Sequence, residues 1–220
     1  MTTRKMYIAE LEELTCQVSR MGTQLEHMID QVIEALKEMD GEEAGTLIKE
    51  DDIIDRMERE IERRCIDIIA KQQPVATDLR RISSIMRLIS DIERIADHCA
   101  DIAEHIISLC TRPEIPMPRG LFEMLRHMRS MVSRTINSFI EENIENTRQI
   151  VKDDDIVDQY FAEIKDNICD LMKENPDNIQ PYVDYLLIIK YVERMADHAT
   201  NIAEWVAFIV TGDLEGPLHN

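Results

Sequence analysis

Apolar residues recur between Leu11 and Met39 at alternating steps of three and four. This seam consists of Leu11, Leu14, Val18, Met21, Leu25, Met28, Val32, Ala35 and Met39. Such spacing gathers the apolar side chains on one side of a long α-helix and is typical of antiparallel bundles. A second seam has the same spacing and follows the middle of the chain: Leu121, Leu125, Met128, Val132, Thr135 and Phe139.

Glycine, proline and asparagine divide the rest of the pattern. The breaks fall at Gly41 and Gly45, Pro74, Pro113 to Gly120, Asn143 and Asn146, Pro176 and Pro181, and Gly212. These residues end helices or start turns. The pattern therefore predicts six long helices, three on each side of a linker. The predicted units are a first three-helix repeat (1–112), the linker (113–120), a second three-helix repeat (121–212) and a C-terminal tail (213–220).

The two halves repeat one another in sequence. ISDIERIADHCADIAE, from Ile89 to Glu104, matches IKYVERMADHATNIAE, from Ile189 to Glu204. KEDDIID, from Lys49 to Asp55, matches KDDDIVD, from Lys152 to Asp158. Because three segments match in the same order, we infer an internal duplication. The predicted fold class is all-α, with two tandem three-helix bundles.

The charge balance excludes some partners. The chain of 220 residues has 44 Asp and Glu against 25 Lys and Arg, a net charge of −19. Such a surface repels phosphate backbones and anionic membranes and attracts cations or basic protein surfaces. We expect no nucleic-acid binding and no direct membrane insertion, because the longest apolar run is too short to span a bilayer. Met1 to Glu10 has no signal-peptide pattern, and the five cysteines form no CxxC pair. We therefore expect a cytoplasmic protein with reduced thiols at or near the core.

Part of the acidic excess is clustered on helix faces. Residues four apart lie on the same face of a helix, about 6 Å from each other. Four carboxylate pairs have this spacing, two in each half, and Asp101 extends one of them: Asp51 with Asp55, Glu93 with Asp97, Asp154 with Asp158, and Glu193 with Asp197. Pairs on neighbouring helices would face each other and repel, and a cation would remove that repulsion. These nine residues are the predicted metal ligands.

A solvated acidic face is the alternative, and for a single pair it would be the better explanation. Duplication of the pairs on matching helices favours metal. Arg94 and Arg194 either brace a carboxylate or form an ordinary salt bridge within the helix. His98 and His198 point about 100° away from the neighbouring Asp around the helix, which favours a capping or supporting role over ligation.

No catalytic apparatus is evident. The sequence has neither a GxGxxG nor a GxxxxGK[ST] loop, no HExxH, and no ExxH of the kind found in di-iron bundles. We predict a protein that is not an enzyme. A multinuclear metal-dependent hydrolase and a purely structural helical spacer remain as alternatives, because a carboxylate-bound cluster can activate water.

These segments resemble a known family. The run PVATDLRRISSIMRLISDIERIADHCADIAEHI, from Pro74 to Ile106, is similar to the core motif of PhoU proteins, and YLLIIKYVERMADHATNIAEWV is similar to the second half of that family. The resemblance covers almost the whole chain. One departure is that Asp78, in the DLR element, corresponds to Asn178.

The resemblance implies a fold, a cofactor and partners. PhoU proteins are two three-helix bundles whose E(D)xxxD motifs hold multinuclear metal clusters. It implies iron or zinc first, with magnesium, manganese, calcium or nickel as alternatives. It also implies negative regulation of phosphate uptake and of the phosphate-starvation response. The implied partners are the ATPase subunit of the phosphate ABC transporter and a membrane sensor histidine kinase, and the implied assembly is a homodimer.

Overall fold

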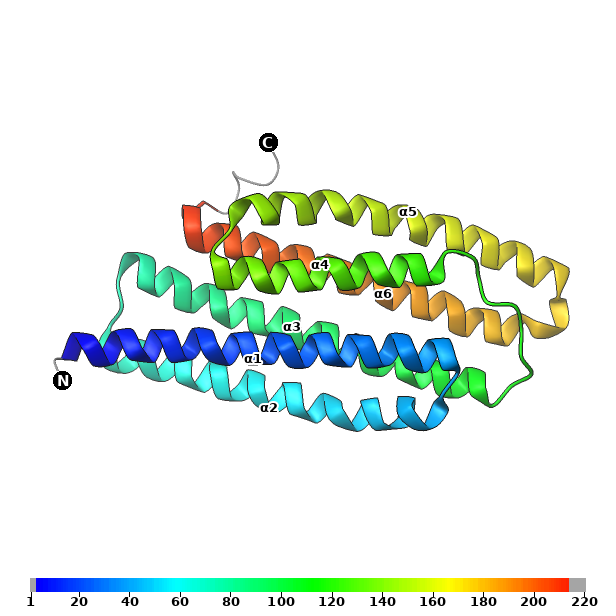
Figure 1. Ribbon diagram of the computed structural model, residues 1–220, viewed down its shortest axis with the longest axis horizontal. Coiled ribbons are helices and arrows are strands. Elements are labelled where there is room, and N and C mark those ends of the chain that lie inside the picture. Colours follow the sequence, from blue (N-terminus) through cyan, green and yellow to red (C-terminus); the bar gives the residue numbers. More distant parts are fainter. Residues whose placement is uncertain (1–2, 214–220) are drawn as a thin grey trace.

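The described part of the chain forms six long α-helices that run up and down as two three-helix units (Figure 1). The computed structural model describes residues 3–213, and side chains from residue 5 onward. The first unit contains α1 (Thr3–Glu38), α2 (Gly41–Gln72) and α3 (Ala76–Cys110). The second contains α4 (Leu121–Glu141), α5 (Ile144–Glu174) and α6 (Ile179–Thr211), with the short 3-10 turn η1 (Pro176–Asn178) before α6. The prediction of an all-α fold with three helices on each side of a linker is confirmed.

The predicted seams form the cores of both units. In α1, every seam residue from Leu14 to Ala35 is at most 2% exposed. The α4 seam is buried as well, including Thr135, whose hydroxyl donates to the carbonyl of Met131 at 2.8 Å. That bond satisfies the one polar group in the seam, so the apolar face remains continuous.

The duplication extends to the turns. Asp40 caps α2 by accepting from the backbone N–H groups of Glu42 and Glu43 at 2.9 and 3.0 Å. Asn143 caps α5 in the same way, accepting from Glu145 and Asn146 at 3.0 and 3.3 Å. A short polar side chain at this position satisfies N–H groups that have no partner within the helix. The predicted ligand pairs on α2 and α5 therefore lie at matching positions relative to the start of each helix.

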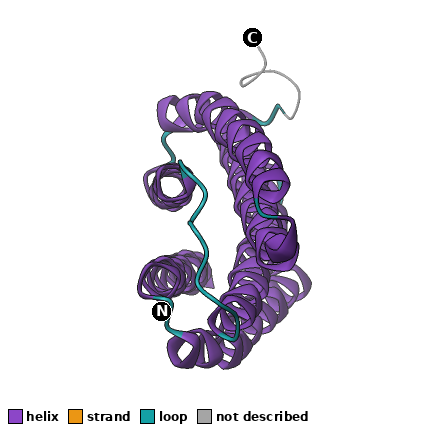
Figure 2. Cartoon of the chain, turned by 90° about the vertical axis from the view of Figure 1, so that its right-hand side faces the viewer, coloured by secondary structure: helices purple, strands orange, loops and turns teal. Residues whose placement is uncertain are grey.

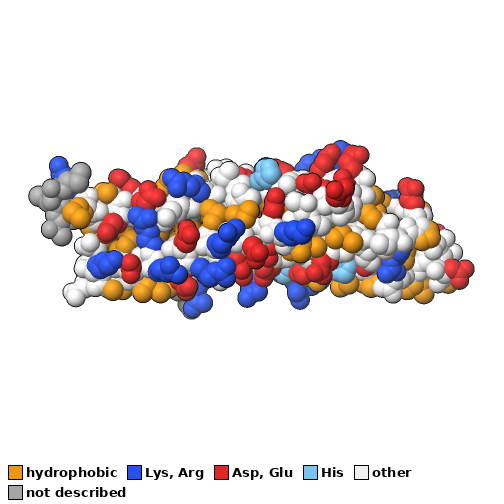
Figure 3. All heavy atoms as spheres, turned by 90° about the horizontal axis from the view of Figure 1, so that it is seen from below, with side chains coloured by type: hydrophobic (Ala, Val, Ile, Leu, Met, Phe, Trp, Pro, Cys, Tyr) orange, Lys and Arg blue, Asp and Glu red, His pale blue; other side chains and the backbone are white. Residues whose placement is uncertain are grey.

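The helices lie in two layers. Helices α2, α3, α6 and α5 are neighbours in that order, and α3 and α6 form the interface between the two units. Helices α1 and α4 lie side by side on one face of this layer, as the end-on view shows (Figure 2). Acidic side chains gather near the middle of the face seen from below, with lysine and arginine side chains around them (Figure 3).

The ends of the repeats differ from one another. The loop between Cys110 and Leu121 contains the predicted linker, whereas the predicted tail lies outside the described residues apart from Asp213. Asp78 lies in the first turn of α3 and accepts from the Tyr7 hydroxyl at 2.9 Å. Asn178 instead ends η1, before α6 begins. The Asp78–Asn178 departure therefore coincides with a real difference in how α3 and α6 start.

Two further expectations concern the surface. None of the helices in the described part of the chain is long and apolar enough to cross a membrane. All five cysteines are free, but only Cys65 and Cys99 are buried. The expectation that every thiol lies at or near the core was wrong for Cys16, Cys110 and Cys169. Their helices present these positions to solvent, because a helical pattern places a residue only as well as the neighbouring helices cover that face.

Candidate metal centre

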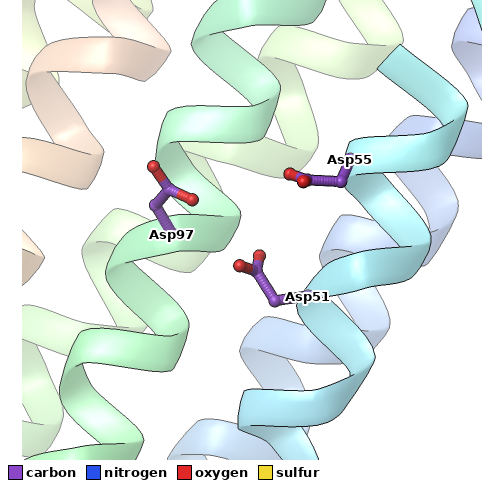
Figure 4. Close-up of side chains that lie close together, drawn as sticks. All are labelled: Asp51, Asp55 and Asp97. Carbon is purple, nitrogen blue, oxygen red and sulfur yellow. The ribbon is translucent and has the colours of Figure 1, made fainter. Parts of the chain in front are cut away.

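Three carboxylates converge between α2 and α3. Asp51 and Asp55 come from successive turns of α2, and Asp97 points toward them from α3 (Figure 4). One oxygen of each lies within 4.8 Å of the others, and all three residues are half-buried. Ligands bound to one ion are separated by distances of this order, since metal–oxygen bonds are about 2.0 to 2.6 Å long. We call these residues, with Glu93 and Asp101 beside them, the first cluster.

Burial and mutual repulsion make the first cluster costly without a cation. Burial, followed by the charges of Asp97 and Asp55, raises the pKa of Asp51 from 3.8 to about 6. Burial and the charge of Asp97 also raise the pKa of Glu93 from 4.5 to about 7, although Arg94 opposes the rise. A bound cation would favour the ionised forms and reverse both shifts.

The first cluster also contains a buried oxygen that has no hydrogen-bond partner. Oδ1 of Asp51 is inaccessible to solvent and has no hydrogen-bond partner. Buried acceptors are almost always satisfied, so an unsatisfied one calls for an explanation such as a missing ion. The converging group consists of carboxylates alone, which suits hard or borderline ions such as magnesium, manganese, iron, calcium or zinc. The residues present therefore fit a cation.

The other predicted ligands of the first half lie at its rim. The charge of Asp97 raises the pKa of Glu93, but Glu93 is not in the converging group. Asp101 is one turn beyond Asp97, and its Oδ2 lies 3.1 Å from Nδ1 of His98. Its charge still makes a small contribution to the raised pKa of Asp51. Arg94 braces the rim, since it lies 3.0 Å from Asp97 and 3.5 Å from Glu93.

His98 and His198 lie at the interface between the two units. The rings of His98 and His198 are 5.7 Å apart across α3 and α6. Nδ1 of His198 lies 2.8 Å from Oδ1 of Asp91. Each imidazole is thus oriented by a carboxylate, and neither ring belongs to the converging group. Their neighbours place them at the contact between the two halves.

The second cluster, on α5 and α6, repeats the composition of the first but not its geometry. It consists of Asp154, Asp158, Glu193 and Asp197. Burial, then the charges of Asp197 and Asp158, raises the pKa of Asp154 from 3.8 to about 6. The charges of these four residues thus influence one another, yet within residues 3–213 they do not form a converging group like that of the first cluster. Asp158 and Asp197 are also more exposed than Asp55 and Asp97.

Sequence reasoning missed two residues beside the clusters. Glu58 follows Asp55 by one turn, and its charge contributes to the raised pKa of Glu93. Lys190 precedes Glu193 by one turn and forms an ion pair with it. Both were visible in the alignment of the halves, where Glu58 corresponds to Phe161 and Lys190 to Ser90. Because these residues differ between the halves, matching identical acidic positions does not reveal them.

The fold and the clusters define a class: helical proteins built from a duplicated three-helix unit with a carboxylate cluster on each copy. A family model described as "PhoU domain" matches this chain twice, over residues 18–106 and 121–206. The chain belongs to the PhoU family.

Curated relatives and solved structures agree with this. The chain is 35% identical over 211 residues to a "Phosphate-specific transport system accessory protein PhoU homolog" of Clostridium acetobutylicum, covering 96% of each protein. It is 35% identical to the homologue of Aquifex aeolicus, covering 84% of each. The crystal structure of PhoU from Pseudomonas aeruginosa superimposes with a TM-score of 0.91 at 30% identity, covering 94% of this chain and 100% of that one. The phosphate transport system regulatory protein PhoU from Streptococcus pneumoniae gives 0.89 at 30% identity, covering 94% and 98%.

Proposed function

We propose that this protein is a cytoplasmic, metal-binding regulatory adaptor of phosphate homeostasis. It lowers phosphate uptake and the phosphate-starvation response when phosphate is plentiful. Its partners are the ATPase subunit of the phosphate ABC transporter and a membrane sensor histidine kinase, and it acts as a homodimer. The names of its relatives support a role in phosphate transport, and those relatives are described as accessory or regulatory proteins.

The observation that carries the metal-binding part is the first cluster. Asp51, Asp55 and Asp97 offer three oxygens within one coordination sphere, and Asp51 has an oxygen without a partner. A cation held by these residues would tie α2 to α3 and replace their repulsion by attraction. Because the folded chain assembles the cluster, metal stabilises it by mass action, by about 2.7 kcal/mol at a hundredfold excess over the dissociation constant.

The first experiment measures metal. The protein is purified without chelators, its metal content is determined by mass spectrometry, and its melting temperature is recorded before and after chelation. We expect bound metal and a lower melting temperature after chelation, and in Asp51→Asn/Asp97→Asn we expect the metal held by the first cluster, with its share of the stabilisation, to be lost. The matched control is Asp52→Asn/Asp155→Asn, which removes the same charge from exposed neighbours and should retain the metal. Metal-free protein with an unchanged melting curve would favour the structural spacer.

The second experiment separates the adaptor from the hydrolase. The loaded protein is assayed against phosphoesters, and cells carrying a deletion of the gene are assayed for phosphate uptake in rich phosphate. The adaptor predicts no turnover and raised uptake in the deletion strain. Turnover that disappears in Asp97→Asn would establish the hydrolase instead, and unaltered uptake would remove the regulatory role.

A further inference from the structure

The two carboxylate clusters differ at a pair of neighbouring positions. The register that matches Asp51 with Asp154 also matches Glu58 with Phe161, and the register that matches Glu93 with Glu193 matches Ser90 with Lys190. The first half thus has a carboxylate and a hydroxyl where the second has an aromatic ring and an ammonium group. The exchange adds a positive charge and removes a negative one.

In the second cluster the ammonium group lies among the carboxylates. Lys190 is ion-paired with Glu193, and its Nζ lies 5.3 Å from the centroid of the Phe161 ring. A cation over an aromatic face is attracted to the ring, so Phe161 helps to hold the lysine in place. The charge of Lys190 also opposes the rise in the pKa of Asp158 and of Asp197, which burial causes in the first place.

At the position that matches Lys190, the first cluster has Ser90. Ser90 lies beside Glu58, whose pKa is raised by burial first and lowered in part by the Ser90 hydroxyl. Both residues line an open groove of about 400 Å³. Arg94 lies on the rim with its side chain 58% exposed. Arg59 pairs with Asp55 at 3.4 Å from a similarly exposed position, and the Oδ1 of Asp51 is left without a hydrogen-bond partner.

We propose that Lys190 is a built-in counter-ion of the second cluster, so that divalent cations load the first cluster and enter the second only by displacing the Lys190 ammonium group. This inference rests on the proposed metal-binding function and makes the two duplicated sites unequal. The physical reason is that a tethered ammonium group neutralises part of the charge that attracts the metal and repels the metal itself. A lysine that merely forms a surface ion pair with the residue three positions away would leave metal binding unchanged.

The test exchanges the two residues. Metal-stripped full-length protein is titrated with Zn²⁺ and with Mn²⁺ by calorimetry. Three proteins with Asp51→Asn/Asp97→Asn are compared, so that the second cluster is measured alone. The first has no further change, the second adds Lys190→Ser and the third adds Lys190→Arg. We expect Lys190→Ser to tighten binding at the second cluster by about tenfold and Lys190→Arg to leave it weak. Ser90→Lys, in the otherwise wild-type chain, should weaken the first cluster by about tenfold.

A matched control and a second measurement keep the test decisive. Lys165→Ser makes the same change in net charge at an exposed lysine that pairs with Asp166 at 3.8 Å, and it should not alter binding. In stripped protein, Lys190→Ser should lower the melting temperature and metal should restore it. Ser90→Lys should raise the melting temperature of stripped protein and reduce the further rise on adding metal.

The outcomes distinguish the inference from the function it rests on. If the first cluster of the wild type takes up metal and Lys190→Ser changes neither affinity nor melting temperature, the counter-ion inference is overturned and the metal-binding function stands. If no variant takes up metal at either cluster, both are overturned. An equal effect of Lys165→Ser would show that overall charge, rather than the position of Lys190, governs binding, and would also overturn the inference.

Discussion

Glu93 and Asp51 hold protons at a pH where exposed carboxyl groups have lost them. Their pKa values are about 7 and about 6 because each is half-buried next to other carboxylates. A cation bound at the first cluster would therefore compete with protons near neutral pH. Without metal, each increase in pH through this range adds a charge that the folded chain accommodates poorly.

The first residue-scale prediction concerns pH. A carboxyl group whose pKa is raised by folding contributes stability below its unfolded value, and that stability is lost as the pH rises through the folded value. For Asp51 and Glu93 the loss falls between about pH 4 and pH 7. The free energy of unfolding of stripped protein should therefore decline across this window more steeply in the wild type than in Asp51→Asn/Glu93→Gln. Urea titrations at several pH values measure it, and parallel curves would contradict the assigned shifts.

The second concerns Asp101. The third helix has Asp101 where the sixth has Asn201, and an Asp offers a charge and two oxygens where an Asn offers one neutral oxygen. We expect Glu93→Ala/Asp97→Ala to lose more metal than Glu193→Ala/Asp197→Ala, and Asp101→Asn to reduce the difference. Metal stoichiometry of the purified variants decides it. Because Asp101 also contacts His98, equal losses with a silent Asp101→Asn would leave it only the role of orienting that histidine.

At the scale of elements, the interface between the two units depends on the close approach of helices and on buried polar contacts. Gly22 of α1 lies against Ile136 of α4, where an added Cβ would come within 2.8 Å of the Ile136 side chain. Asp184 of α6 is 5% exposed and reaches α3, with its oxygens 2.9 Å from His105 Nδ1 and 3.0 Å from Ser108 Oγ. These contacts join α1 to α4 and α3 to α6 across the two units.

Gly22→Ala tests the close approach. Replacing Gly by Ala within an exposed helix ordinarily stabilises by about 1 kcal/mol. Here the methyl group meets a branched side chain that must shift, so we expect destabilisation of about 1 to 3 kcal/mol. The matched control is Gly45→Ala, where nothing lies within 4 Å of the added Cβ. Chemical denaturation measures both, and a stabilising Gly22→Ala would show that α1 and α4 separate easily.

Asp184→Ala tests the polar contact between α3 and α6. The substitution leaves the partners on α3 without an acceptor, which costs about 1 to 3 kcal/mol. Asp170→Ala is the control, because Asp170 is exposed and pairs only with Lys173 among the interactions of the described chain. Its effect should stay within about 0.5 kcal/mol. Equal denaturation midpoints for the two variants would show that the Asp184 contact adds nothing to the packing of the units.

For the whole molecule, the net charge of −19 determines which partners can approach. Long-range attraction to a basic surface speeds association and is screened by salt over about 8 to 10 Å. We expect the proposed complex with the transporter ATPase subunit to weaken as salt rises, mainly through a slower association rate. Surface plasmon resonance at low and high salt measures this, and an affinity independent of salt would argue against an acidic docking surface.

The sequence determined the helices, their number and their duplication, because these depend on local periodicity. The seam of α1 could be read residue by residue, since an amphipathic helix buries whichever stripe is apolar. The breaks were predicted from residues such as Gly41 and Asn143, and the structure adds that the side chains of Asp40 and Asn143 cap the next helix. The carboxylate pairs were found in the same way, from a spacing of four within one helix.

Only the tertiary structure decided which of these carboxylates meet and what else lies among them. The packing of α2 on α3 brings Asp51 and Asp55 to Asp97, whereas Asp101 contacts His98. The packing of α5 on α6 places Lys190 over Phe161. The reason is physical: a spacing of four fixes the face of one helix, but a site between two helices depends on their rotation and axial shift. Those are set by the whole core, to which residues far apart in the sequence contribute together.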